Sequence, residues 1–368
     1  MFALAWRNLT HDRTRFTVNV LGIAFAVFLM TFQAGLLAGF TLAASRVIDS
    51  CSADLWIAPR GVPCFDFAAT LQDRTRDIAR GIEGVADAGR VASGFAVFQK
   101  TDGVRQTVMV LGVDELFAGR VPQVRSGARR ESTLVDRTDA MLLVAGQTPA
   151  SVEINGHRAR VSGISMGFAS FLGSPYVFTG YRDAIDYLRV PPEQAMFVLV
   201  KASPGADLVP LRDRLRRRFP NYDVWTRAEF SWRARTYWLV QTGAGGALSL
   251  SALLGFLIGL AIISQTTYAT TMENIEEYAT LKAMGASRGF VRGVVLLQSL
   301  CCGACGALLG FVAVDPAASL ARSIVTWVLV PRWTFGAVSA TTLLMCALAS
   351  VISVRAATRV EPGRVFRA

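Results

Sequence analysis

Four long apolar runs constrain this chain more than any other feature. They extend from about Phe16 to Ala44, from Tyr237 to Thr267, from Phe290 to Val314 and from Gly336 to Val354. A helix rises 1.5 Å per residue, so about 20 apolar residues cross a bilayer. We therefore expect four membrane-spanning helices. The first two runs exceed this length, which predicts that they tilt or project beyond the membrane as helical stalks.

The composition agrees with a membrane protein that also carries a soluble domain. Hydrophobic residues make up 52% of the 368 residues, and the excess is concentrated in the four runs. Residues 46–235 are polar enough and numerous enough to bury a core of their own. The net charge of +11 does not indicate nucleic-acid binding, because no nucleic-acid-binding module is recognisable.

The distribution of basic residues predicts the orientation in the membrane, because short loops rich in Lys and Arg stay in the cytosol. The only basic residues of the loop 315–335 are Arg322 and Arg332. We expect both termini in the cytosol and residues 46–235 outside it. The basic residues that flank the runs on the expected cytosolic side are Arg7, Arg13, Arg15, Lys282, Arg288, Arg292, Arg355, Arg359, Arg364 and Arg367.

Residues 46–235 mix strand and helix patterns, which predicts an α+β domain. The dipeptide Asn155-Gly156 predicts a tight hairpin turn. Strand-like runs occur at Ala53–Ala58, Val91–Phe98, Gln106–Val113, His157–Ile164, Tyr176–Thr179 and Ala195–Lys201. Helical spacing fits Thr70–Gly81, Tyr181–Arg189 and Leu208–Phe219. The outer aromatic belt of the second run is expected to comprise Phe230, Trp232, Tyr237 and Trp238.

The six cysteines fall into two groups. Cys51 and Cys64 lie in the outer segment, where disulfides can persist. A Cys51–Cys64 disulfide and two unpaired thiols are both open. The other four lie in apolar runs, where Cys behaves as a small hydrophobe, and no His is near them to complete a zinc site. We predict no metal site. These four are Cys301, Cys302, Cys305 and Cys346.

The residue types argue against catalysis by this chain. ATP hydrolysis needs a phosphate-binding loop with Gly-Lys followed by Ser or Thr, and none of Lys100, Lys201 and Lys282 has this context. We expect no cofactor in this chain, with ATP and Mg bound by a partner. The stretch Gly163–Gly167 matches the G-x-S-x-G motif of hydrolases, but no His follows Ser165 as that fold requires.

Small residues in the runs predict close helix packing. The G-x-x-x-G spacing lets helix backbones approach each other in lipid, either within a chain or between two copies. No charged residue lies near the middle of a run, which argues against an ion-coupled carrier. The spaced glycines are Gly35 and Gly39, Gly255 and Gly259, and Gly306 and Gly310.

The loop between the second and third runs carries the most specific signal. Residues from about Asn274 to Met284 have the spacing of a short amphipathic helix, and Gly285 would end it as a C-cap. Such a helix is suited to a groove on a cytosolic partner. The predicted coupling residues are Glu276, Glu277, Tyr278, Thr280, Leu281, Lys282, Met284 and Gly285. Those expected to touch the partner are Glu277, Tyr278, Leu281 and Met284.

The segment Glu277–Gly285 reads Glu-Tyr-Ala-Thr-Leu-Lys-Ala-Met-Gly and resembles the coupling segment of MacB/FtsX-type ABC permeases. It is most similar to the DevC branch. The resemblance is specific in the first run and in this segment, and loose from Gln72 to Arg235. The other segments that resemble the family are Ile23–Met30, Ala53–Pro59 with Phe65-Asp66, and Arg359–Arg367, where Glu-Pro-Gly stands in place of the usual Asp-Pro-Ala.

This resemblance implies a homodimeric permease in the bacterial inner membrane, bound to two copies of a separate ABC ATPase. It further implies a periplasmic adaptor (a membrane fusion protein) and an outer-membrane channel. In such systems the ATPases push on the coupling helices, and the stalks move the periplasmic domains, a process called mechanotransmission. The cargo would be a lipid, a glycolipid or another hydrophobic molecule.

Two other functions remain open. An FtsX-like transducer that activates a periplasmic cell-wall hydrolase would need the same stalks and coupling segment. A membrane-anchored binding or sensor module without an ATPase would leave Glu276–Gly285 unexplained.

The predicted layout alternates cytosolic, membrane and periplasmic segments. It comprises a cytosolic amphipathic segment (1–15), the first span and stalk (16–45), the α+β domain (46–235), the stalk and second span (236–268), the coupling loop (269–289), the third span (290–314), a short periplasmic loop (315–335), the fourth span (336–354) and a cytosolic tail (355–368).

Overall fold

The computed structural model describes residues 13–99, 103, 105–121, 132–136, 152–165, 168, 174–322 and 328–358. Most of the predicted N-terminal segment and the family-like tail Arg359–Arg367 therefore lie outside the described residues. The chain divides into two compact units, each with its own buried core. The first comprises Met1–Gly39, Gly246–Ile324 and Val328–Ala368, and the second Phe40–Gly245 and Val325–Trp327.

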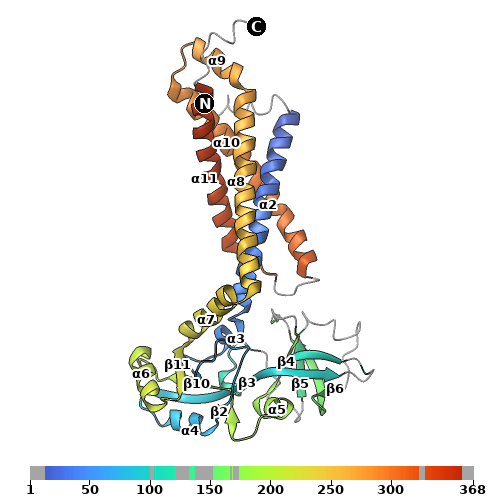
Figure 1. Ribbon diagram of the computed structural model, residues 1–368, viewed down its shortest axis with the longest axis vertical. Helices are drawn as coiled ribbons and strands as arrows, with labels where there is room; N and C mark the ends of the chain where they lie inside the picture. The colour runs from blue at the N-terminus through green and yellow to red at the C-terminus, as the bar shows by residue number, and fades with distance from the viewer. Residues whose placement is uncertain are drawn as a thin grey trace. The chain divides into compact units, whose positions relative to one another are not determined.

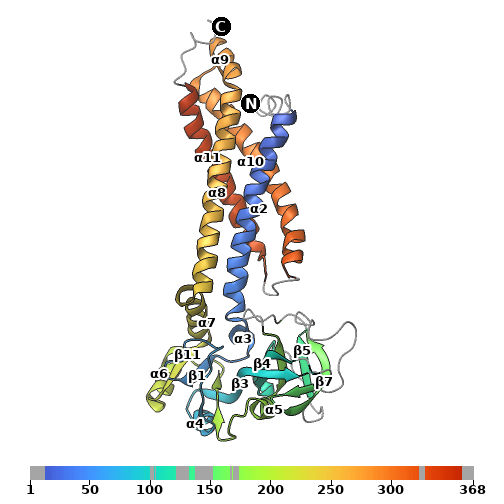
Figure 2. The ribbon, with the colours of Figure 1, turned by 45° about the vertical axis from the view of Figure 1, so that its right-hand side comes forward.

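The first unit is a bundle of long helices, and the four predicted apolar helices are confirmed. Figures 1 and 2 show them side by side. Each has an apolar stretch long enough to cross a membrane, and many of its outward side chains are large and apolar. The four helices are α2 (Arg13–Ala43), α8 (Gly243–Glu273), α10 (Arg288–Arg322) and α11 (Arg332–Thr358).

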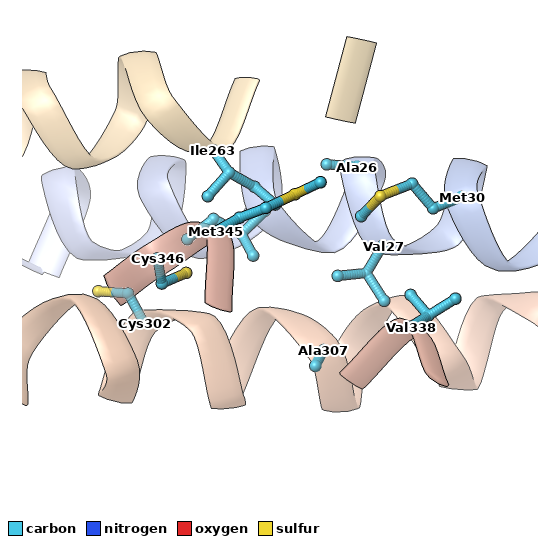
Figure 3. Close-up of a cluster of buried hydrophobic side chains, with 10 residues drawn as sticks. Ala26, Val27, Met30, Ile263, Cys302, Ala307, Val338, Met345 and Cys346 are labelled. Atoms are coloured by element: carbon cyan, nitrogen blue, oxygen red, sulfur yellow. The ribbon is translucent and has the colours of Figure 1, made fainter. Parts of the chain in front are cut away.

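The core of the bundle combines side chains from all four helices (Figure 3). Val27 of α2 is fully buried, and Cys302 and Cys346 are free thiols packed in the same cluster. The other buried members are Ile23, Ala26, Met30, Ile263, Ala307, Val338 and Met345. The two cysteines thus act as small apolar residues here.

Glycines bring α8 and α10 into close contact with α2. A Cβ atom on Gly306 would lie 2.6 Å from Cγ2 of Ile23, and one on Gly310 would lie 2.6 Å from the backbone oxygen of Ala24. The same construction places Gly255 against Gln33, Gly259 against Met30, and Gly35 against Val330. Four of these glycines therefore pack helices of one chain together, while a role in a dimer stays a prediction.

The second predicted span begins later in the structure than its apolar run. Residues Tyr237–Gln241 form a π-helical turn, η3, and Thr242 is extended. The Thr242 hydroxyl accepts a hydrogen bond from the backbone N–H of Gly245, so it caps the first turn of α8. A Cβ on Gly245 would lie 2.2 Å from the Trp238 carbonyl oxygen, which leaves room only for glycine.

The second unit is an α+β domain, as predicted, and its described strands form a nine-stranded sheet in the order β11-β1-β10-β3-β4-β8-β5-β7-β6. These strands are β1 (Leu55–Pro59), β3 (Val85–Gln99), β4 (Arg105–Val113), β5 (Ser132–Asp136), β6 (Val152–Ile154), β7 (His157–Ser165), β8 (Tyr176–Gly180), β10 (Phe197–Ala202) and β11 (Tyr222–Thr226). A separate short pair comprises β2 (Leu71–Gln72) and β9 (Gln194–Ala195).

Helices and short turns accompany the sheet. They are α3 (Arg46–Ser50), α4 (Arg74–Arg80), η1 (Glu115–Phe117), α5 (Tyr181–Tyr187), α6 (Leu208–Arg218) and α7 (Arg227–Thr236). Helix α5 packs against β3 and β4, α4 against β3 and β10, and α6 against β11. The sheet therefore has helices along most of its described length.

The long strand β3 joins two parts of the sheet. Its first half pairs with β10, its second half with β4, and its last residues Phe98 and Gln99 pair with β6. The pairings β3-β4-β8-β5-β7-β6 thus return to β3 and form a closed ring. Closing a sheet in this way removes exposed strand edges.

Local patterns predicted most of these elements. The Asn155-Gly156 turn is confirmed, with φ of 50° and 84°, and it joins β6 to β7. The helix predicted over Thr70–Gly81 begins only at Arg74, because Leu71 and Gln72 pair with β9. Ser165 is the last residue of β7, and Met166 and Gly167 of the hydrolase-like motif lie outside the described residues.

The assignment of four aromatic residues to a membrane belt was wrong for two of them. Phe230 is fully buried in the core of the second unit, where the centroid of its ring lies 5.4 Å from that of the Trp56 ring. Trp238 is also buried, and its ring stacks on Phe67. Of Phe230, Trp232 and Trp238, only Trp232 is largely exposed. Aromatic character alone does not distinguish a domain core from a membrane interface.

We predict that Gly310→Ala lowers the stability of the bundle by about 1–3 kcal/mol, because the added methyl group overpacks the contact with α2. The thermal midpoint of the detergent-solubilised chain measures this effect. Gly336→Ala is the matched control, since nothing lies within 4 Å of a Cβ at that position. Equal midpoints for the two variants would contradict the packing argument.

Candidate ATPase-coupling site

A short helix, α9 (Ile275–Ala283), lies between α8 and α10, and it confirms the helix predicted from Asn274 to Met284. Gly285 follows it with φ of +93°, a backbone conformation that favours glycine. The N–H of Ala286 donates to the carbonyl oxygen of Leu281 at 3.0 Å. This bond and the left-handed glycine are typical of a Schellman C-cap, so the end of α9 is fixed by its own sequence.

The turn from α9 into α10 is capped on its other side as well. The Ser287 hydroxyl accepts a hydrogen bond from the backbone N–H of Phe290 at 3.2 Å. Serine in this position satisfies a free N–H at the start of a helix. With a cap on each side, the connection between the two helices is short and well defined.

One face of α9 packs onto α10. Tyr278 is 4% exposed and forms a buried cluster with Val291, Val294 and Val295. Its hydroxyl donates a hydrogen bond to Oε1 of Gln298 at 2.6 Å. Burial raises the pKa of the Tyr278 phenol, so this group stays protonated and remains a donor.

This arrangement corrects part of the prediction from sequence. Tyr278 was expected to touch a cytosolic partner, but it is buried inside the chain against α10. Leu281 is half-buried beside the same cluster. The apolar face of α9 is therefore largely used by its own bundle, which the spacing of apolar residues could not reveal.

The opposite face of α9 is open. Glu276, Glu277 and Thr280 are exposed, and Met284 at the end of the helix is 72% exposed. Gly285 is exposed as well, while the side chain of Lys282 lies outside the described residues. The two carboxylates in the first turn interact favourably with the helix dipole. The open face thus offers negative charge at one end and a flexible apolar side chain at the other.

Polar contacts hold α9 to the other helices. The Asn274 side chain donates to the carbonyl oxygen of Thr270 at 3.0 Å, and the backbone carbonyl oxygen of Asn274 accepts from the N–H of Tyr278. Asn19 of α2 donates to the Thr270 hydroxyl at 2.8 Å. These bonds link the start of α9 to the end of α8, and α8 in turn to α2.

In the second unit, an ion pair joins the segment that follows α2 to the segment that precedes α8. Arg235 of α7 donates to Asp49 of α3 and to the Ser45 hydroxyl, each at 2.8 Å. The Ser45 hydroxyl in turn donates to Asp49. Because α3 also packs on α7, the two ends of the unit are fastened to each other.

A buried carboxylate holds the π-helical turn η3. The indole N–H of Trp238 donates to Asp66 Oδ2 at 3.0 Å. Burial raises the pKa of Asp66 to about 6, although the Trp238 hydrogen bond opposes this shift. Burial also raises the pKa of the nearby Cys64 thiol to about 12. Both Cys51 and Cys64 are free and buried, so the disulfide considered from sequence is not formed in the structure.

Comparison with protein families agrees with this architecture. Residues 16–218 match the model of the MacB-like periplasmic core domain, and residues 249–362 match that of the FtsX-like permease C-terminal domain. The chain belongs to the MacB/FtsX family of ABC transporter permeases. The second match covers α8, α9 and α10, and so includes the candidate coupling site.

Curated relatives carry the same description. The chain is 21% identical over 373 residues to the uncharacterized ABC transporter permease Rv0072 of Mycobacterium tuberculosis, with 100% of this chain and 99% of that protein covered. It is 22% identical over 371 residues to the uncharacterized ABC transporter permease Rv2563, with the same coverage. The matches do not distinguish the DevC branch, so that closer assignment stays a prediction.

Among solved structures, the periplasmic region of MacB from Actinobacillus actinomycetemcomitans aligns with a TM-score of 0.38 and 11% identity, over 49% of this chain and 92% of that one.

For this MacB/FtsX permease, we predict that the second unit loses stability as the pH rises. The native state holds the Asp66 proton between pH 3.8 and about 6, where the unfolded chain has released it. Stability from this carboxyl is therefore greatest below pH 3.8 and falls by about 3 kcal/mol as the pH rises from 3.8 to about 6. Thermal unfolding of the full chain between pH 4.5 and 7.5, followed by tryptophan fluorescence, measures the slope.

The variant Asp66→Asn should abolish this part of the pH dependence. Asp77→Asn is the control, because the Asp77 side chain is 58% exposed and pairs with Arg76 at the surface. An unchanged slope in Asp66→Asn would show that another group is responsible.

Proposed function

We propose that this permease is the membrane subunit of an export system, driven by a separate ABC ATPase. The observation that carries the proposal is the division of α9 into two faces. One face is fixed to α10 by Tyr278 and a valine cluster, and the other offers Glu276, Glu277 and Met284 to a partner. A helix fixed on one side and open on the other can transmit a push without yielding.

In this proposal the ATPase binds ATP and Mg, and this chain supplies no catalytic group. The complex has two permease copies in the bacterial inner membrane and two ATPase copies, which contact the α9 helices. The termini of the permease lie in the cytosol. Movement of α9 passes to α10 and α8, and then along the chain to the second unit. The Arg235–Asp49 ion pair supports the last step, because it fastens together both segments that connect that unit to the helices.

We further propose that the second unit lies in the periplasm and works with an adaptor and an outer-membrane channel. The cargo would be a lipid, glycolipid or other hydrophobic molecule that does not cross the bundle. The absence of charged residues near the middle of the apolar runs favours this, because a polar path would need groups to line it.

A mild-detergent pull-down of the tagged chain, with mass spectrometry of the bound proteins, tests the assembly. An ABC ATPase together with a periplasmic adaptor supports the export system. An ATPase with a cell-wall hydrolase would instead identify a transducer, and recovery of no ATPase would contradict the role of α9.

The same pull-down tests the open face of α9. We predict that Met284→Asp reduces recovery of the ATPase by about tenfold or more, because it places a charge in an apolar contact at the end of the helix. Leu116→Asp is the matched control, since Leu116 is equally exposed but lies in the second unit. Unchanged ATPase recovery with Met284→Asp would exclude this face as the contact.

A further inference from the structure

The helix bundle contains a polar cleft close to α9. It lies between α2, α8 and α10 and has room for about one water-sized group, with about 10 Å³ open to the centre of such a group. Its polar lining comes from Thr266, Thr267, Thr270 and Thr271 of α8 and from Gln298 and Ser299 of α10. None of the described residues that line it is charged. Such a gathering of hydroxyl and amide groups between apolar helices needs an explanation, since polar groups in membrane helices are costly and are often functional.

Gln298 is the key residue of this cleft. Its side chain is 2% exposed, and its Oε1 accepts the Tyr278 hydrogen bond. Its Nε2 is buried and has no hydrogen-bond partner in the part of the chain that the structure describes. A buried amide donor without a partner is strongly unfavourable, so a group absent from the polypeptide is expected to accept from it.

Tyr278 determines which way this amide faces. The Tyr278 hydroxyl donates to Oε1 of Gln298, so the carbonyl oxygen of Gln298 points toward Tyr278 and the NH₂ group points away from it. Tyr278 is therefore a positioning residue for the cleft. Its position on α9 connects the coupling helix to the polar site.

The hydroxyl groups around the cleft offer acceptors. Thr270 donates its hydrogen to the carbonyl oxygen of Thr266, and Thr271 donates to that of Thr267, at 2.9 and 2.8 Å. Ser299 donates in the same way to Val295. Because these hydrogens are already used, the oxygens present lone pairs to any further ligand. An occupant must then accept from Gln298 and donate to a hydroxyl oxygen.

We propose that this cleft binds a neutral hydroxyl group, which accepts from Nε2 of Gln298 and donates to the hydroxyl oxygen of Thr271. Only a group that both donates and accepts satisfies the two sides, and the lack of charged lining residues disfavours an ion. Water and the alcohol of a lipid headgroup share this chemistry. This proposal rests on the helix bundle alone, so its test does not depend on which ATPase, if any, binds the chain.

A thermodynamic cycle on the full chain tests the site. The variants are Thr271→Val, Gln298→Met and the double variant, and the readout is the thermal midpoint in lauryldimethylamine oxide, which has no hydroxyl group. We expect Thr271→Val to lower the midpoint by about 2 °C, through the loss of one hydrogen bond to the ligand. In the Gln298→Met background the same change should cost only the loss of the Thr271 bond to the carbonyl oxygen of Thr267, because the ligand is already lost.

Thr341→Val is the matched control. Thr341 is half-buried on α11 and does not line the cleft, and its hydroxyl makes the same bond to the carbonyl oxygen four residues earlier, to Ala337 at 2.8 Å. It reports the cost of losing that bond without a cleft. If the Gln298→Met variant does not fold, the Gln298→Asn variant is used in its place. Its side chain is one methylene group shorter, so the amide is drawn back from the ligand.

Two conditions distinguish the sources of the hydroxyl. Coupling between Thr271 and Gln298 in lauryldimethylamine oxide identifies water. Coupling that arises only in nanodiscs of phosphatidylglycerol, and not in those of phosphatidylcholine, identifies a lipid alcohol. If Thr271→Val matches Thr341→Val and is additive with Gln298→Met in all three, the cleft holds no such ligand and the proposal is overturned.

Discussion

The close contact of α10 with α2 is the interaction on which the helix bundle depends. In a membrane, helices gain little from hiding apolar surface, so packing and hydrogen bonding must hold them together. Gly306 and Gly310 allow the backbone of α10 to approach Ile23 and Ala24 of α2 at van der Waals distance. Elsewhere on α10, Gln298 and Ser299 lie beside the threonines of α8 and line the polar cleft.

The coupling helix gains its definition from that bundle. Alone, a nine-residue helix would be marginal in water. Here a Schellman cap at Gly285, a serine cap at Ser287 and the Tyr278 cluster fix it to α10. The side chain of Tyr278 therefore has a structural role inside the chain, whereas Glu277 and Met284 are exposed. Mechanical transmission from an ATPase requires this kind of rigidity.

The second unit is organised around aromatic packing and two polar contacts. Trp56 lies among Phe65, Phe197 and Phe230, which ties β1, β10 and α7 into one core. The Arg235–Asp49 ion pair and the Trp238–Asp66 hydrogen bond lie where the chain enters and leaves the unit. Both connecting segments are thus held by polar contacts within the same compact unit.

The sequence by itself determined the four apolar helices, the α+β character of residues 46–235, the Asn155-Gly156 hairpin and helix α9 with its glycine cap. Each depends on hydropathy or on local backbone preferences, which neighbouring residues fix. Only the tertiary structure decided which face of α9 is buried, that Phe230 and Trp238 belong to a domain core, and that β3 closes a ring with β6. These depend on partners far away in the chain, such as Asp66 for Trp238 and Gln298 for Tyr278, and no local pattern specifies a distant partner.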